Sequence, residues 1–375
     1  MKAGWRTGLA VAGVAVSAAA FAVLWPHARD AGALLLAQDD PVALSDMQIN
    51  SALRNDPSAI GQNVEAALLS NDAELAKSFT DLANDKDAPV AADVVAKVDA
   101  AVAEENSASN TARRFMKGLV TGEADDVASL SGTVTGDLFV FGDIRDVIRE
   151  GKRLVMGEDA DRLVLGLASI GLAVTAATYV SVGGVVPVRA GLTMVKDARK
   201  VGRLGAGLTE WAGRSARGVV DAPMLQKAVA DASIARPGQT ISAVKAAFKA
   251  EKAGALVRLA KDTGRVAEKA GTKGALDVLR IADGPADVAR AAKLAEKKGS
   301  QTRAIIKVLG RGALLLAAGA FNLAWWVFGA CLALIGFLAS IKATTERLTT
   351  SYLQRKKLRR ARRELALAQN SALAA

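Results

Sequence analysis

The sequence predicts an all-α integral membrane protein, and three observations lead to this prediction. Apolar residues make up 51% of the chain and aromatic residues only 4%, a composition that suits helices packed closely through small side chains. Three long runs carry no charged residue, and the charges between them are segregated into acidic and basic blocks. We therefore expect an N-terminal anchor helix, an acidic helical domain, a Gly-rich second apolar segment, a basic helical domain and a long C-terminal apolar helix or re-entrant hairpin.

The first apolar segment lies within residues 1–26 and runs from Thr7 to Trp25, behind the basic residues Lys2 and Arg6. As a helix, its 19 residues rise about 28 Å, close to the roughly 30 Å thickness of the bilayer hydrocarbon. The segment is longer than the apolar region of a typical signal peptide, which favours an uncleaved membrane anchor. The alternative is a signal peptide cleaved after the small-x-small pattern at residues 20–22, and both interpretations export the residues that follow.

Residues 27–162 hold 25 acidic and 13 basic residues, a net charge of −12. Short apolar periodicities divided by Asn and Asp predict a domain of short helices. We expect this acidic helical domain to be non-cytoplasmic, because it follows an exporting segment.

Three aspartates stand near the end of this acidic block, at Asp137, Asp143 and Asp146. One interpretation is a carboxylate cluster for cation binding or general acid-base catalysis, which would make the protein a hydrolase. The interpretation that we favour is a series of glycine-bounded turns whose aspartates cap the next helix.

The pattern GDIRDVIREG at residues 142–151, followed by Gly157, Asp161-Arg162 and LGLASIGL, resembles the pre-toxin segment of bacterial polymorphic toxins. In that family, a Gly-Asp turn and a short amphipathic stretch precede a glycine-rich apolar helix. The resemblance covers about 35 of the 375 residues, and the sequence has a basic tail where that family has its toxin domain. It raises the hypothesis of a toxin-like protein and assigns no residue.

The second apolar segment, residues 163–188, contains several Gly and Thr residues and leads into a basic block. It is a candidate transmembrane segment, since small residues let membrane helices approach one another, and its alternative is a buried helical hairpin of a soluble domain. Residues 189–311 hold 25 basic and 11 acidic residues, a net charge of +14, and predict basic helices that either face an anionic leaflet or form a solvated bundle. Nucleic acid is not expected as a partner, because Trp211 and Phe248 are the only aromatic residues in this block.

The third apolar segment, residues 312–341, contains 29 uncharged residues from Ala313 to Ile341, which as a helix would extend about 44 Å. That length exceeds one perpendicular span and falls short of two, so we weigh a transmembrane helix against a hairpin that turns near Asn322 and Trp325. The basic tail, residues 342–375, has a net charge of +7. The residues expected to set topology or contact lipid are Lys2, Arg6, Arg355, Lys356, Lys357, Arg359, Arg360, Arg362 and Arg363.

The sequence contains no recognisable catalytic, cofactor or metal motif, and its single Cys331 and single His27 exclude the common Cys-His and His-rich sites. We therefore expect a non-catalytic envelope scaffold, adaptor or assembly component of a bacterial inner membrane, with N-terminus and tail cytoplasmic. Its expected partners are anionic lipid and proteins of unknown identity, with homo-oligomers as a further option. The alternative is a membrane-permeabilising protein that inserts its apolar segments.

Overall fold

The computed structural model describes residues 2–107, 133–177, 186–219, 221–230, 237–315 and 320–373. These residues form helices and turns without a strand, so the all-α class is confirmed for them. The chain divides into two compact units. We call them the hairpin unit, which comprises Met1–Gln38 with Leu316–Ala375, and the helical body, which comprises Asp39–Leu315.

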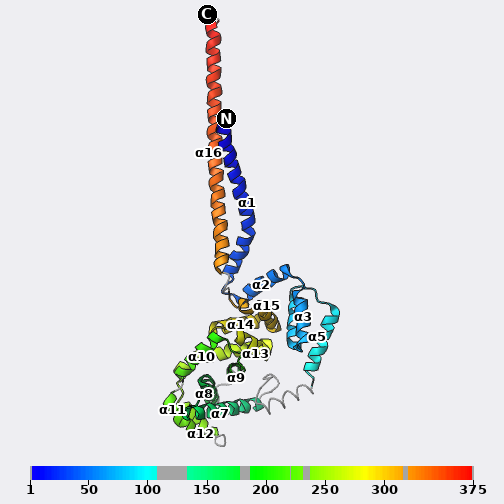
Figure 1. Ribbon diagram of the computed structural model, residues 1–375, viewed down its shortest axis with the longest axis vertical. Helices are drawn as coiled ribbons and strands as arrows, with labels where there is room; N and C mark the ends of the chain where they lie inside the picture. The colour runs from blue at the N-terminus through cyan, green and yellow to red at the C-terminus, as the bar shows by residue number, and fades with distance from the viewer. Residues whose placement is uncertain are drawn as a thin grey trace. The chain divides into compact units, whose positions relative to one another are not determined.

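The hairpin unit consists of α1 (Lys2–Leu36) and α16 (Ala320–Leu373), which lie side by side and run in opposite directions (Figure 1). Small residues bring the two helices together: a Cβ atom on Gly13 would lie 3.9 Å from Ser340 Oγ, and one on Gly336 would lie 4.0 Å from Ser17 Oγ. Each helix thus carries a Gly-x-x-x-Ser pair, and each glycine faces the serine of the other pair. Such pairs allow close approach of helices in membranes.

The register of the hairpin is uniform along its length. Further along the same helices, the His27 ring stacks on the Trp326 ring with centroids 5.0 Å apart. In this pair and in both Gly/Ser pairs the two residue numbers add up to 353. The helices therefore remain paired without a slip of register from residue 13 to residue 27 of α1.

The third apolar segment is split between the two units. α16 begins at Ala320 and continues through Asn322 and Trp325 as one long apolar helix, so of the two alternatives the structure contains the single helix and has no turn at these residues. Ala313 and Leu314 are instead fully buried in the core of the helical body. This division explains why the uncharged run is too long for one span.

The helical body contains thirteen α-helices in its described residues. They are α2 (Pro41–Asn55), α3 (Ala59–Leu69), α4 (Ala73–Asp85), α5 (Ala92–Glu105), α7 (Thr133–Val155), α8 (Arg162–Ala177), α9 (Val186–Lys200), α10 (Ala206–Val219), α11 (Ala222–Ala230), α12 (Pro237–Ala246), α13 (Gly254–Ile281), α14 (Pro285–Lys298) and α15 (Thr302–Leu309). Three short 3₁₀ turns, η2 (Ala250–Lys252), η3 (Gly299–Gln301) and η4 (Gly310–Ala313), separate the last helices.

The second apolar segment forms part of the core of the helical body. Residues 163–173 of α8 are all buried, and α8 packs against α7, α9, α10 and α12. With 16 residues, α8 is about 24 Å long, shorter than the bilayer hydrocarbon. For the described part of this segment, the structure agrees with the alternative of a buried helix in a compact domain.

The acidic and basic blocks belong to the same body. Helices α2 to α5 come from the acidic block, and α4 and α2 pack against α15, which comes from the basic block. Residues 39–315 carry a net charge of only +2, because the two blocks nearly neutralise each other. We expected residues 163–188 to separate two domains, but the residues on both sides of this segment belong to the same compact unit.

Glycines allow the closest helix packing in the body. A Cβ atom on Gly191 of α9 would lie 1.8 Å from the Ala260 carbonyl oxygen of α13, and one on Gly264 of α13 would lie 2.0 Å from the Pro187 carbonyl oxygen of α9. The backbones of α9 and α13 therefore touch at both points, a contact that only glycine permits. This is the small-residue helix packing that the composition predicts.

Candidate functional sites in the two units

A buried charge cluster lies between α7 and α9. Asp143 and Asp146, one turn apart on α7, face Lys196 and Lys200, one turn apart on α9. Lys196 Nζ donates a hydrogen bond to Asp143 and lies 3.4 Å from Asp146 Oδ2, while Lys200 Nζ lies 2.8 Å from the same oxygen. Asp143, Asp146 and Lys196 are each more than nine-tenths buried.

This geometry corrects the prediction that these aspartates cap helices after glycine-bounded turns. Asp143 and Asp146 lie in the middle of α7, which continues as a helix through Gly142. Asp137 also belongs to α7, but its side chain is outside the part that the structure describes. The sequence contained a signal for the pairing: carboxylates at a spacing of three and ammonium groups at a spacing of four each occupy one helix face.

A glycine of the apolar α8 makes room for the cluster. A Cβ atom on Gly171 would lie 2.0 Å from Asp143 Oδ2, so any larger residue would displace this carboxylate. Glu150 of α7 anchors the start of the same helix, because its Oε2 accepts a hydrogen bond from the Asp161 backbone amide at 3.0 Å. Asp161 then caps α8 by accepting from the amides of Leu163 and Val164. The polar groups of α7 thereby fix the position of α8.

The charges of the cluster are balanced internally. Burial raises the pKa of Asp143 and outweighs the opposing effect of Lys196. Burial also opposes ionisation of Asp146, but Lys196 and Lys200 outweigh it and lower the pKa of Asp146. Burial raises the pKa of Asp197, at the edge of the cluster, to about 6 against the partial compensation of the same two lysines.

This arrangement is chemically suited to holding helices together. Two ammonium groups lie where a divalent cation would need to bind, and their charge would repel it. The described residues contain no group of three or more His, Cys, Asp and Glu side chains that could hold a metal ion. A cluster with buried, mutually paired charges positions α7, α8 and α9 relative to one another.

A second network joins the acidic and basic blocks. Arg303 of α15 donates from both terminal nitrogens to the Asp72 carboxylate, at 2.7 and 2.6 Å, and from Nε to Asp277 at 3.0 Å. Lys273 of α13 donates to Glu105 of α5 at 2.9 Å. Burial opposes ionisation of Asp72, but the hydrogen bonds from Arg303 outweigh it and hold the pKa of this carboxyl below its usual value.

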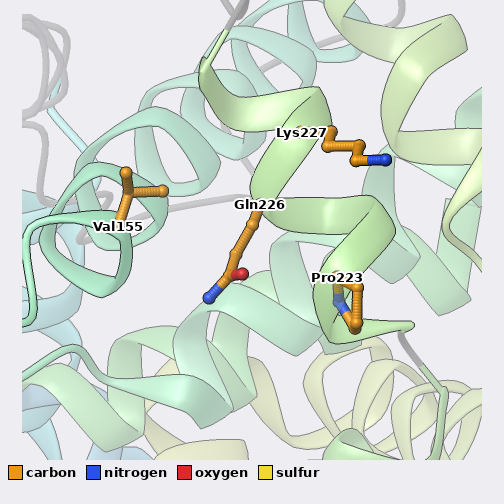
Figure 2. Close-up of a pocket in the computed structure, with 4 residues that line it drawn as sticks. All are labelled: Val155, Pro223, Gln226 and Lys227. Carbon is orange, nitrogen blue, oxygen red and sulfur yellow. The ribbon is translucent and has the colours of Figure 1, made fainter.

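A shallow hollow on the helical body is lined by Val155, Pro223, Gln226 and Lys227. Figure 2 shows that Val155 comes from α7 and the other three from α11, and that the Gln226 and Lys227 side chains point in different directions. A binding site for a small molecule needs polar groups that converge on it. The lining residues of this hollow do not meet that requirement.

The hairpin unit exposes large apolar side chains around both helices. Val16 is 69% exposed, Trp325 64% and Ile335 62%, and α16 is long and apolar enough to cross a membrane by length and composition. Such a surface is unusual for a soluble protein, in which large contiguous apolar patches mark interaction sites. The hairpin is therefore the second candidate site.

The predicted topology residues lie at one end of the hairpin. Lys2 and Arg6 belong to the first two turns of α1, although their side chains are outside the described part. The seven basic residues from Arg355 to Arg363 lie on α16 and are all exposed. Because the register total is 353, Arg6 lies opposite Arg347, so this end of the hairpin is basic on both helices.

Comparisons with protein-family models, curated proteins and solved structures found no match to this chain. The toxin-like resemblance of residues 142–172 thus stays a hypothesis. In the structure, its Gly142-Asp143 pair is helical and does not form a turn.

Proposed function

We propose that this protein is a non-catalytic scaffold, adaptor or assembly component of a bacterial inner membrane, anchored by the α1/α16 hairpin. The observation that carries the proposal is the apolar exterior of a hairpin whose interior is lined with small residues. This arrangement suits a membrane, because lipid solvates the large apolar side chains on the outside of the hairpin and the small residues between the helices let them approach.

Exposed side chains on both helices give the hairpin a strong preference for lipid over water. Eleven large apolar residues are at least 40% exposed in residues 13–27 of α1 and 325–341 of α16: Val16, Val23, Trp25, Trp325, Trp326, Phe328, Leu332, Leu334, Ile335, Leu338 and Ile341. Transfer of their exposed surface from water to lipid is worth on the order of 10 kcal/mol. Between Arg6 and Arg29, α1 has 22 uncharged residues, which rise about 33 Å and suffice to cross the hydrocarbon.

The antiparallel hairpin suggests a topology. Two crossings place the N-terminus and the tail on one side of the membrane and residues 39–315 on the other. Lys and Arg near the ends of the two helices are more numerous on the side of the termini (Lys2, Arg6, Lys342, Arg347 and Arg355) than on the side of residues 39–315 (Arg29, Lys307 and Arg311), and the positive-inside rule assigns the more basic side to the cytoplasm. Both the acidic and the basic block then lie on the non-cytoplasmic side, as one nearly neutral body.

Cysteine labelling tests this topology directly, since Cys331 is the only native cysteine. In a Cys331→Ser background, single cysteines replace exposed Asn50, Lys252 or Arg359. A membrane-impermeant maleimide should label positions 50 and 252 in spheroplasts and position 359 only after permeabilisation. Different labelling of positions 50 and 252 would contradict the single-body topology, and equal labelling of all three positions would show that the hairpin does not span.

The membrane-permeabilising alternative predicts dye leakage from anionic liposomes. We expect binding without leakage, because the described part of α8 is already buried in the helical body and only the hairpin exposes a long apolar surface. The hydrolase alternative requires Asp137, Asp143 and Asp146, and an unchanged cellular phenotype after alanine substitution of all three would exclude it. Asp143 and Asp146 are already occupied by lysines.

A further inference from the structure

The last part of α16 extends beyond its partner helix. With a register total of 353, Lys2 at the start of α1 lies opposite Ser351, so α16 has no α1 residue beside it from Tyr352 onward. Residues 352–364 are all exposed, and Figure 1 shows α16 continuing past the N-terminus. None of the seven basic residues in this stretch forms an ion pair within the described part of the chain.

The continuous helix carries these charges away from the membrane surface, a point that rests on the proposed span of α16. Arg355 lies 8 residues beyond Arg347, the residue opposite Arg6 at the start of the α1 span, and Arg363 lies 16 residues beyond it, which correspond to about 12 and 24 Å along the helix. The headgroup layer occupies only about 6 Å on each side of the hydrocarbon, and charges in physiological salt are screened within about 8 Å. Most of the cluster is therefore out of reach of anionic headgroups.

The unpaired helix is amphipathic in the manner of a coiled-coil strand. Leu358 and Ala361 lie on one face of α16, and Leu365 and Ala368 follow in the sequence seven residues after each of them. This spacing of three and four corresponds to alternating a and d positions of a heptad repeat. We call residues 354–368 the basic seam helix.

Basic residues flank this apolar face on both sides. With Leu358 at position a, Arg355 and Arg362 occupy e positions, Lys357 occupies one g position and the acidic Glu364 occupies the next g position. These are the positions whose charges select the partner of a coiled coil. A parallel pair of two copies would place Lys357 of one helix beside Arg362 of the other, and such like charges destabilise the pair.

We propose that the basic seam helix is a docking surface for an amphipathic helix of another protein that has an apolar seam and acidic e and g positions. The basic side chains favour an acidic partner. The apolar face at Leu358 and Ala361 favours an amphipathic helix over a polyanion without an apolar surface. Because α16 stands away from the lipid, the partner binds on the cytoplasmic side at a distance from the membrane surface.

The test uses the full-length protein in nanodiscs of neutral phosphatidylcholine at about 0.15 M salt. The probe is a fluorescent peptide of about four heptads with Leu at a and d and Glu at e and g. A control peptide of identical composition has its leucines moved off the seam. We expect the seam peptide to bind at least about tenfold more tightly than the control peptide.

Matched variants separate the seam from general charge. Arg355→Glu with Arg362→Glu reverses two e positions, and Lys356→Glu with Arg363→Glu reverses two f positions that point away from the seam. The first pair should weaken seam-peptide binding about tenfold and the second less than about threefold. Leu358→Gln should weaken it by about fivefold, whereas Leu353→Gln, at an exposed position off the seam, should leave it unchanged.

Three results would overturn the inference. Equal losses from the e and f reversals would indicate unspecific attraction of polyanions. Tighter binding of a short RNA duplex than of the seam peptide would assign the tail to nucleic acid. Loss of peptide binding in nanodiscs containing phosphatidylglycerol would assign the tail to lipid. The peptide assay also works in detergent, so failure of the membrane topology and failure of the docking surface are distinguishable.

Discussion

Replacement of Arg303 by methionine tests whether the acidic and basic blocks form one body. Only 6% of the Arg303 side chain is exposed, and it makes three hydrogen bonds of 2.6 to 3.0 Å to Asp72 and Asp277. Loss of one partner from a buried ion pair costs about 3–5 kcal/mol. Here we expect about 3 kcal/mol, because Lys273 and Lys307 still compensate the two carboxylates that remain.

A double-mutant cycle isolates the contact itself. Asp72→Asn alone, Arg303→Met alone and both together are compared in the full chain by hydrogen exchange of peptides from α4 and α15. We expect the two substitutions to be coupled by about 2 kcal/mol, since a bidentate pair that is largely shielded from water retains most of its interaction. Asp72 also caps α4, and the cycle removes that separate contribution from the coupling energy.

A coupling energy below about 0.5 kcal/mol, the range found for distant sites, would contradict the contact between Asp72 and Arg303. That result would mean that residues 72 and 303 are not in contact in the native protein. They would be apart if the acidic and basic blocks lay on opposite sides of a membrane. Arg280→Met serves as the control: its side chain is 53% exposed and 3.7 Å from Asp277, so it should cost less than about 1 kcal/mol.

Three further predictions test other parts of the structure. Burial raises the pKa of Asp197 to about 6, so the stability that its protonated form contributes is present at low pH and is lost as the pH rises through that value. The Asp197→Asn protein should therefore unfold at the same temperature as wild type near pH 4. Near pH 7.5 it should be more stable than wild type by about 2 kcal/mol. Gly191→Ala should cost at least about 2 kcal/mol in denaturant unfolding because its Cβ meets a backbone oxygen at 1.8 Å, whereas Gly213→Ala in α10, with nothing within 4 Å, should be neutral or slightly stabilising. In a protein with Cys331 replaced, the double variant Gly13→Cys/Ser340→Cys should form a disulfide in membranes. The double variant Gly13→Cys/Ser351→Cys should not, because its two cysteines are about 16 Å apart along the helix axis. The reverse result would contradict the hairpin register.

The composition and the charge pattern were sufficient to predict the helical class and the two helices of the hairpin. They could not predict the position of α8. A helix enclosed on all sides by protein and a helix enclosed by lipid are both apolar around their whole circumference, so periodicity does not separate them. Only the length of the helix does, and the 26 uncharged residues from Leu163 to Val188 include all of α8 except Arg162 and also the start of α9.

The charge networks were also beyond prediction from sequence. Arg303 and Asp72 are 231 residues apart, and segregation of their two blocks suggested separation where the structure shows attraction. Long-range ion pairs have no local signal, since each partner alone resembles a solvated surface residue. The cluster around Asp143 was partly predictable, because its carboxylates and lysines occupy matching helical faces, but nothing in the sequence indicates that α7 and α9 are neighbours.

The burial of α8 has a consequence for the synthesis of this protein. Under the topology proposed above, residues 162–177 pass through the protein-conducting channel as an unfolded apolar segment before the helical body exists to enclose them. Their mean hydropathy is held down by Gly166, Gly171 and Ser169, and their helix is shorter than the hydrocarbon is thick. Under that topology, Gly171, which makes room for Asp143 in the folded protein, also lowers the tendency of the nascent segment to remain in the membrane.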